Sequence, residues 1–230
     1  MRGETISTEL KAVQNSTCCP LCQSTDLYVL TCRKVPYVRC RYCQLVHLPK
    51  AYQLSLADEK ARYDLHNNDP FDPKYRQFLN RSFEQVVQRL SPPATGLDFG
   101  CGPGPALIEM AREQGYAMQG YDPFYAPDTS VLSKRYDFVT CTEVAEHLAN
   151  PLQEMETLWS LLKPNGFLVI QTQRVLSDQR FCQWRYPLDP THITFFSEIS
   201  FQWLAQRWQA KLSFPRSDVV VFETKKNPAL

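Results

Sequence analysis

The fold is decided by one stretch of sequence, Gly96-Leu97-Asp98-Phe99-Gly100-Cys101-Gly102-Pro103-Gly104. Its first part predicts a strand, and three of the chain's eight glycines then follow closely. Glycine tolerates positive φ and lets another group approach the backbone. A helix is predicted at 105–111, because Pro105 suits a first turn and Gly115 suits a C-cap. Strand, glycine loop and helix N-terminus in this order indicate a nucleotide or nucleoside site.

The details of the loop narrow the class of ligand. A dinucleotide fingerprint needs Gly or Ala directly after Gly104, where this chain has Pro105. No Gly-Lys-Ser/Thr follows, which excludes a phosphate-binding P-loop. Asp122 ends the next predicted strand, 118–121, near the offset from Asp98 at which a carboxylate accepts hydrogen bonds from ribose hydroxyls. The sequence therefore predicts a nucleoside ligand without a pyrophosphate.

Three segments carry a specific resemblance. The stretch from Leu97 to Gly104 resembles the first motif of class I S-adenosylmethionine (SAM)-dependent methyltransferases. Their fourth-strand segment is resembled by Tyr136-Asp137-Phe138-Val139-Thr140-Cys141-Thr142-Glu143-Val144-Ala145-Glu146-His147-Leu148. Their joint between a helix and the fifth strand is similar to Leu161-Leu162-Lys163-Pro164-Asn165-Gly166-Phe167-Leu168-Val169-Ile170. The resemblance covers residues 60–222 and leaves the N-terminal part of the chain outside it.

The resemblance implies both a fold and an activity for residues 51–230. Predicted strands alternate with predicted helices, which indicates a parallel sheet covered on both faces. We expect a Rossmann-like α/β fold with a mostly parallel seven-stranded sheet. The implied activity is transfer of a methyl group from SAM to an O, N or C atom of a small or medium-sized molecule. The candidate cofactor-binding residues are Asp98, Phe99, Gly100, Cys101, Gly102, Asp122, Pro123, Thr142 and Glu143.

Each group of these residues has an implied role. Asp122 would accept the ribose hydroxyls, and the loop amides would face the methionine end of the cofactor. Thr142 and Glu143 would lie between that end and the acceptor. Glu146 is expected to be an acid on a helix surface.

Two histidines are candidate catalytic residues. A sulfonium donor is already activated, so the enzyme mainly aligns the reactants. An oxygen or nitrogen acceptor that must lose a proton needs a general base. His147 and His192 follow predicted strands at the carboxyl edge of the sheet, where such sites form. The alternatives are that His147 packs a helix and that His192 fixes a loop. Trp184 and Tyr186 would form an aromatic wall or pack in the core.

A separate module precedes this domain, at residues 1–50. Cys19-x-x-Cys22 and Cys40-x-x-Cys43 have the two-knuckle spacing of a tetrahedral zinc site, and short strands are expected at 27–30 and 37–39. The alternatives are unrelated reduced pairs or a redox dithiol. This head has a net charge of +4 and the remainder −3. The zinc ribbon is predicted to be either a structural clip or a basic surface that recognises substrate.

Composition limits the remaining functions. The chain has 230 residues and a net charge of +1, without an overall bias toward polyanions. No run approaches the roughly 18–20 apolar residues of a membrane span, and residues 1–15 lack a secretory apolar region. We therefore expect a cytoplasmic protein with no membrane partner, whose nine cysteines favour metal ligation over disulfides. Two alternatives remain open: an RNA methyltransferase that binds RNA through its basic head, and a non-catalytic SAM-binding scaffold.

Overall fold

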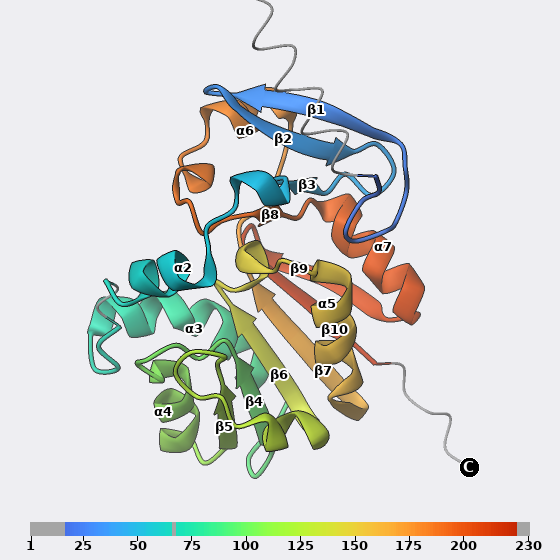
Figure 1. Cartoon of the computed structure of the whole chain (residues 1–230). Helices are drawn as coiled ribbons and strands as arrows, with labels where there is room; N and C mark the ends of the chain where they lie inside the picture. Colours follow the sequence, from blue (N-terminus) through green and yellow to red (C-terminus); the bar gives the residue numbers. More distant parts are fainter. Residues whose placement is uncertain (1–16, 66–67, 225–230) are drawn as a thin grey trace, which may run out of the picture.

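Two β-sheets organise the computed structural model, which describes residues 17–65 and 68–224. The larger sheet has the strand order β5-β4-β6-β7-β10-β9, and the smaller has the order β1-β2-β3-β8. Figure 1 shows the smaller sheet lying over one edge of the larger one, with helices on both sides of the larger sheet. The glycine loop after β4 and the segment after β6 both lead to the region between the two sheets.

The larger sheet is mostly parallel, as predicted. Its strands are β4 (Thr95–Phe99), β5 (Ala117–Tyr121), β6 (Tyr136–Thr142), β7 (Leu162–Gln171), β9 (Lys211–Arg216) and β10 (Val219–Glu223). Strand β4 pairs in parallel with β5 and β6, and β6 pairs in parallel with β7. Strand β10 runs antiparallel to both of its neighbours, β7 and β9.

The prediction of seven strands was wrong, because this sheet has six. The connection from β5 to β6 contains a tight turn, closed by a bridge between Asp122 and Ala126. It also contains the 3-10 helix η2 (Thr129–Ser133), capped by Asp128. A crossover between parallel strands needs about a dozen residues. The turn and η2 together occupy most of the connection between β5 and β6, so no further strand fits there.

Helices cover both faces of the larger sheet because successive side chains of each strand point to opposite faces, and both faces carry apolar side chains. The covering helices are α3 (Pro73–Val87), α4 (Ala106–Glu113), α5 (Pro151–Ser160) and α7 (Glu198–Trp208). Phe138 and Val169 pack in one core with residues of α3 and α4. Their neighbours Val139 and Ile170 pack in the other core, with residues of α5 and α7. Burial on both faces explains the continuous apolar runs that these strands show in the sequence.

The smaller sheet combines the N-terminal head with a distant part of the chain. It consists of β1 (Leu27–Cys32), β2 (Val35–Cys40), β3 (Val46–His47) and β8 (Thr194–Phe195). Arg33 and Lys34 both have positive φ and form the tight turn between β1 and β2. Strand β3 pairs antiparallel with β8, with Val46 opposite Phe195. The sequence did not predict β3 or β8, and their pairing joins residues 1–50 to the rest of the protein.

Short elements complete the connections around the two sheets. They are η1 (Lys50–Tyr52), α2 (Leu56–Tyr63), η3 (Ala145–His147), α6 (Asp178–Gln183) and η4 (Tyr186–Leu188). Among residues 17–65 and 68–224, no helix has the length and apolar character needed to cross a bilayer.

Candidate functional site

The glycine loop follows β4 and folds back onto the end of β5. Gly100 and Gly102 have φ values of +78° and +63°, a region that favours glycine. The Gly100 amide donates a hydrogen bond to the Tyr121 carbonyl at 2.7 Å. A Cβ atom on Gly104 would lie 1.8 Å from the Asn68 carbonyl oxygen. The close backbone approach expected at this loop is thus made, at Gly104, by the segment before α3.

Asp122 holds the loop and the following turn together. Its carboxylate is buried and accepts hydrogen bonds from the amides of Gly102 (3.1 Å), Phe124 (2.8 Å) and Tyr125 (3.0 Å). The adjacent Pro123 is exposed. A carboxylate at the end of the strand beside β4 is therefore fixed next to the glycine loop.

Asp98 lies beneath the same loop. Its buried carboxylate accepts a hydrogen bond from the Thr140 hydroxyl at 2.6 Å. Burial, together with the charge of Asp122, raises the pKa of Asp98 to about 6. Phe99, the next residue, is buried with its ring 5.3 Å from that of Tyr121.

Cys101 fills space in the loop. A Cβ atom on Gly120 would lie 2.9 Å from its sulfur, so the thiol packs closely on β5. Burial raises the pKa of the Cys101 thiol to about 12. The thiol therefore stays protonated near neutral pH, which does not suit a nucleophile.

Thr142 and Glu143 end β6 beside this loop. The Thr142 hydroxyl lies 3.2 Å from the hydroxyl of Ser82, on α3. The Glu143 amide donates to the Gln171 carbonyl at 2.8 Å, and its backbone has a φ of 53°. Burial raises the pKa of the Glu143 carboxyl to about 9, so near neutral pH it is protonated and can donate a hydrogen bond.

Tyr75 belongs to this group although no motif indicated it. Burial, and then the charges of Asp98, Glu143 and Cys101, raise its pKa to about 12. These charges act on Tyr75 because α3, on which it lies, packs against β6.

His147 and His192 lie together beside Glu146. Their ring centroids are 4.8 Å apart. His147 Nδ1 is 2.9 Å from the Thr191 carbonyl oxygen, and His192 Nδ1 is 2.8 Å from that of Tyr186. A carbonyl oxygen only accepts, so each Nδ1 carries the proton and each Nε2 keeps a lone pair. Burial and the neighbouring His147 also lower the pKa of His192, which favours the neutral ring.

Glu146 completes this cluster, and its expected place on a helix surface was wrong. The carboxylate is fully buried and accepts hydrogen bonds from the hydroxyls of Tyr186 and Thr172. The residue lies in the short η3, whose backbone turns it inward. The candidate ligand atoms of Glu146, His147 and His192 all lie within 4.8 Å of one another. One carboxylate and two neutral imidazoles are donors that suit a divalent metal ion.

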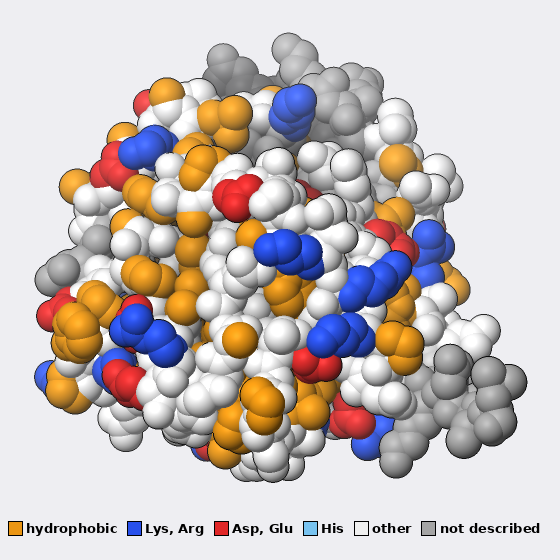
Figure 2. Space-filling model, turned by 90° about the horizontal axis from the view of Figure 1, so that it is seen from below, with side chains coloured by type: hydrophobic (Ala, Val, Ile, Leu, Met, Phe, Trp, Pro, Cys, Tyr) orange, Lys and Arg blue, Asp and Glu red, His pale blue; other side chains and the backbone are white. Residues whose placement is uncertain are grey.

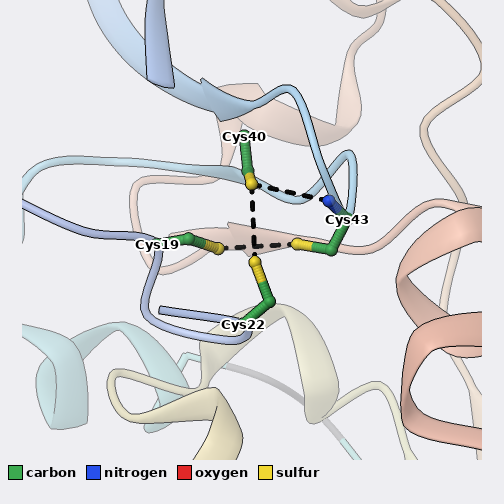
Figure 3. A group of neighbouring side chains, drawn as sticks. All are labelled: Cys19, Cys22, Cys40 and Cys43. Atoms are coloured by element: carbon green, nitrogen blue, oxygen red, sulfur yellow. Dashed lines mark hydrogen bonds between the residues drawn. The ribbon is translucent and has the colours of Figure 1, made fainter. Parts of the chain in front are cut away.

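The four predicted cysteine ligands meet at one point in the head (Figure 3). Cys19 and Cys43 have their sulfurs 3.5 Å apart, as do Cys22 and Cys40. Tetrahedral zinc with bonds of about 2.3 Å would separate the sulfurs by about 3.8 Å, so the arrangement fits such an ion. Gln23 and Gln44, which follow the second cysteine of each pair, both have positive φ. The two Cys-x-x-Cys-Gln turns therefore bend their thiols toward a common centre.

Long-range contacts attach this head to the segment that carries His192. Cys32 forms a disulfide with Cys182, 150 positions away. Buried Arg39 pairs with Asp178 on α6, and the same carboxylate accepts from the Tyr28 hydroxyl. The expectation that metal ligation would replace disulfides does not hold for Cys32. Two single cysteines far apart in the sequence offered no spacing from which to predict the bond.

The chain resembles known methyltransferases in sequence. A family model described as "Methyltransferase domain" matches residues 73–212. Ubiquinone biosynthesis O-methyltransferase of Histophilus somni (strain 2336) is 33% identical over 82 residues, 34% of each chain. The enzyme of the same name from Actinobacillus pleuropneumoniae serotype 5b (strain L20) is 28% identical over 92 residues, 38% of this chain and 39% of that protein. The matches thus span only about a third of the length of these relatives.

Solved structures of low sequence identity also align with the chain. A SAM-dependent methyltransferase from Archaeoglobus fulgidus aligns with a TM-score of 0.49 at 15% identity, over 65% of this chain and 94% of that one. Magnesium protoporphyrin IX methyltransferase from Synechocystis PCC 6803, with bound SAH, has a TM-score of 0.46 at 14% identity, over 74% and 94% of the two chains. The family model spans more than half of the sequence, including the glycine loop, Asp122 and the histidine His147. The chain therefore belongs to the methyltransferase-domain family.

Proposed function

We propose that this protein transfers a methyl group from SAM to a hydroxyl oxygen of a small molecule. The observation that carries the proposal is half-buried His192 beside His147 and Glu146, with its Nδ1 held by the Tyr186 carbonyl so that Nε2 keeps a lone pair. The names of the curated relatives, which are O-methyltransferases, support oxygen as the acceptor atom.

The cofactor half of the proposed site consists of the glycine loop and its two acids. When bound, SAM supplies a methyl group already activated on a sulfonium. The Asp122 carboxylate would accept hydrogen bonds from the ribose hydroxyls, and Pro123 would flank the adenine. Asp98 would attract the cofactor's ammonium group from beneath the loop. The space around the methionine end of the cofactor would be lined on one side by Phe99, Gly100, Cys101 and Gly102. Thr142 and Glu143 would line the other side of that space.

The acceptor half would prepare the hydroxyl group for attack. His192 Nε2 would take the hydroxyl proton, since the Tyr186 carbonyl holds the other ring nitrogen as the donor. The resulting imidazolium would be stabilised by the buried Glu146 carboxylate, whose charge favours protonation of His192. Removal of the proton by such a base contributes about 10²–10⁴-fold to the rate. His147 packs edge-on against His192 and orients its ring.

The side chains of Glu146, His147 and His192 would also fit a divalent cation, which would activate the acceptor hydroxyl in a different way. Bound by Glu146, His147 and His192, a cation would lower the pKa of the acceptor hydroxyl without a protein base. Treatment with a chelator, followed by one equivalent of zinc to refill the head, separates the two mechanisms. Turnover restored by that single equivalent supports His192 as the base, and turnover that needs a second divalent ion supports the cation.

We further propose that the head holds one zinc ion through Cys19, Cys22, Cys40 and Cys43. Burial raises the pKa of the Cys22 thiol to about 12, whereas the hydrogen bond with Cys43 lowers the pKa of Cys19 to about 6, so all four sulfurs ionise together only with a cation between them. Four thiolates leave no open position, and this supports a structural rather than a catalytic ion.

The RNA alternative gains no support from the structure or the comparisons. Arg39 pairs with Asp178 inside the molecule, and Arg33 donates to the Trp184 carbonyl at 2.9 Å. On the face opposite the head, seen in Figure 2, Lys and Arg side chains are interspersed with Asp and Glu. A protein that grips many phosphates would instead present a continuous basic surface.

Binding and turnover of the purified protein test this function. Calorimetry should detect binding of SAM and of its demethylated product, with no binding of NAD. Labelled SAM should then transfer its methyl group to hydroxyl compounds in a panel of phenols and hydroxy acids, but not to matched amines. Binding of NAD in place of SAM would overturn the assignment. Binding of SAM with no transfer to any member of a broad panel would favour the non-catalytic scaffold.

A further inference from the structure

A cleft of about 760 Å³ lies between the head and the carboxyl edge of the larger sheet. Its wall includes Glu143, which follows β6 in the candidate site. Trp184 and Gln173 line this cleft and also a neighbouring hollow of about 650 Å³ that contains His192. The Trp184 indole donates a hydrogen bond to the Gln173 side chain at 3.2 Å. A molecule in the cleft would therefore lie close to both Glu143 and His192.

Four arginines line the cleft: Arg39, Arg81, Arg174 and Arg180. Three come from elements that are far apart in the sequence, since Arg39 lies on β2, Arg81 on α3 and Arg180 on α6. Arg81 pairs with Asp218 through a single nitrogen. Arg174 pairs with Glu198 and also donates to the carbonyls of Ser217 and Arg216. A guanidinium has five N–H donors, so Arg81 keeps more of them available than Arg174 does.

Arg39 and Arg180 have unused hydrogen-bonding capacity. Arg39 is only 7% exposed, and its Nε is buried with no hydrogen-bond partner in the described part of the chain. Arg180 is exposed, and its side chain pairs with no acid within residues 17–65 and 68–224. Leaving a buried guanidinium donor unpaired is costly, and an incoming anion would remove that cost.

The rest of the wall is partly polar and partly apolar. Its acids are Glu143, Glu198 and Asp218, and the last two pair with Arg174 and Arg81. Its apolar side chains are Phe78, Val175, Leu176, Phe181, Trp184 and Ile199. Leu176 is 67% exposed and Ile199 47% exposed, both unusually high for large aliphatic side chains. Exposed apolar residues around a polar cleft indicate a surface that an apolar ligand covers.

We propose that the methyl acceptor carries an anionic group, a carboxylate or a phosphate, which the arginines of this cleft bind. Its apolar body lies against Trp184, Leu176 and Ile199, and this orients the hydroxyl group toward His192. The inference rests on the proposed function for its hydroxyl acceptor, but the preference for an anion is a property of the cleft and can be measured without turnover. Arg180 is the cleanest residue to change, because within residues 17–65 and 68–224 its exposed side chain makes no ion pair whose loss would disturb folding.

Matched pairs of ligands test the preference directly. Calorimetry on the full-length protein compares para-hydroxybenzoate with para-hydroxybenzyl alcohol, and phenyl phosphate with phenol. The anionic member of at least one pair should bind about tenfold more tightly, as charge-assisted hydrogen bonds to arginine predict. The pair with the larger difference identifies carboxylate or phosphate as the preferred group.

A matched arginine variant provides the control. Arg180→Gln should remove most of the preference, whereas Arg112→Gln should leave it unchanged, because Arg112 pairs with Glu109 on the surface of α4. Equal affinity for charged and neutral ligands, or equal losses in the two variants, would overturn the inference. Failure to bind SAM in a parallel titration would instead overturn the proposed function and leave the anion preference standing.

Discussion

The cofactor half and the acceptor half of the candidate site are assembled in different ways. The cofactor half lies mostly between Asp98 and Phe124, and backbone amides of that stretch hold the Asp122 carboxylate. In the acceptor half, the Tyr186 carbonyl and the Thr191 carbonyl orient two histidines that lie 45 positions apart. The segment that supplies these carbonyls is tied to the head by a disulfide, an ion pair and the β3–β8 pairing.

Because of this difference, a substitution can disrupt cofactor binding without disrupting the acceptor half, and the reverse. A local hydrogen-bond network forms wherever its own strand, loop and turn form. A site held by contacts between distant segments depends on every element that closes it. Damage to the head should therefore remove acceptor chemistry and leave cofactor binding in place.

Loss of the zinc site should produce the largest effect. Structural zinc in small modules supplies about 10–16 kcal/mol of apparent binding free energy. Cys40→Ser should abolish metal binding, expose the head to protease and stop turnover, while SAM affinity stays within a few-fold of the wild type. Zinc analysis, limited proteolysis and calorimetry measure the three outcomes. The control is Cys18→Ser, because Cys18 is exposed and outside the cluster. Equal loss of SAM binding in Cys40→Ser would show that the halves are not independent.

The next effect in size concerns the proposed base. His192→Ala should lower kcat by about 10²–10⁴-fold, the range for loss of a general base. SAM affinity should stay the same, because the cofactor half does not include His192. His147→Ala should mainly lower thermal stability, since its ring packs against His192 and Tyr63. If turnover survives in His192→Ala but disappears in a folded His147→Ala, then His147 and not His192 is the base.

Asp122 tests the cofactor half with a smaller effect. Asp122→Ala should weaken SAM binding by about 1–3 kcal/mol, through lost hydrogen bonds to a charged group. The zinc content should not change, because the head lies outside this network. Asp128→Ala is a matched control, since Asp128 is an exposed cap of η2 in the same connection. If both variants bind SAM as the wild type does, the ribose role of Asp122 is wrong.

The smallest expected effect is a dependence of SAM affinity on pH. Burial raises the pKa of Asp98 from 3.8 to about 6, so the folded protein binds a proton there more readily than the unfolded chain. Folding stability from this group therefore increases as the pH falls from 6 to 4. SAM affinity should change in the opposite direction, about tenfold per pH unit below 6, because protonation removes the charge that attracts the ammonium. Calorimetry between pH 5 and 7 measures this slope.

Asp98→Asn provides the control for the pH dependence. The amide keeps the shape of the side chain but cannot titrate. Its SAM affinity should be lower and flat across the same pH range. A slope that persists in Asp98→Asn would assign the titration to another group.

Motifs with regular local spacing predicted the structure well. The strand before Gly100 and the helix after Pro105 both form, because short-range hydrogen bonding and glycine geometry determine them. The four cysteines also meet as predicted, since each Cys-x-x-Cys is a local turn. The predicted seventh strand failed because strand number depends on the length left in a connection and not on an apolar pattern alone.

Elements whose partners lie far away could not be predicted. Two-residue strands such as β3 and β8 have no periodicity to detect. Glu146 follows an apolar strand like many surface acids, and only the packing of Tyr186 and Thr172 around it reveals that it is buried. The boundary drawn after residue 50 stays a prediction, although β3 and β8 hydrogen-bond across it.

The sequence by itself determined the methyltransferase-like sheet, the glycine loop with Asp98 and Asp122, and the cysteine turns of the head. These features depend on neighbouring residues, whose geometry is limited by φ, by capping and by chain length. Only the tertiary structure decided that His147, His192 and Glu146 form one cluster, and that arginines from β2, α3 and α6 line one cleft. The physical reason is that such contacts form after distant segments pack, and the free energy of that packing is spread over the whole core rather than over any one motif.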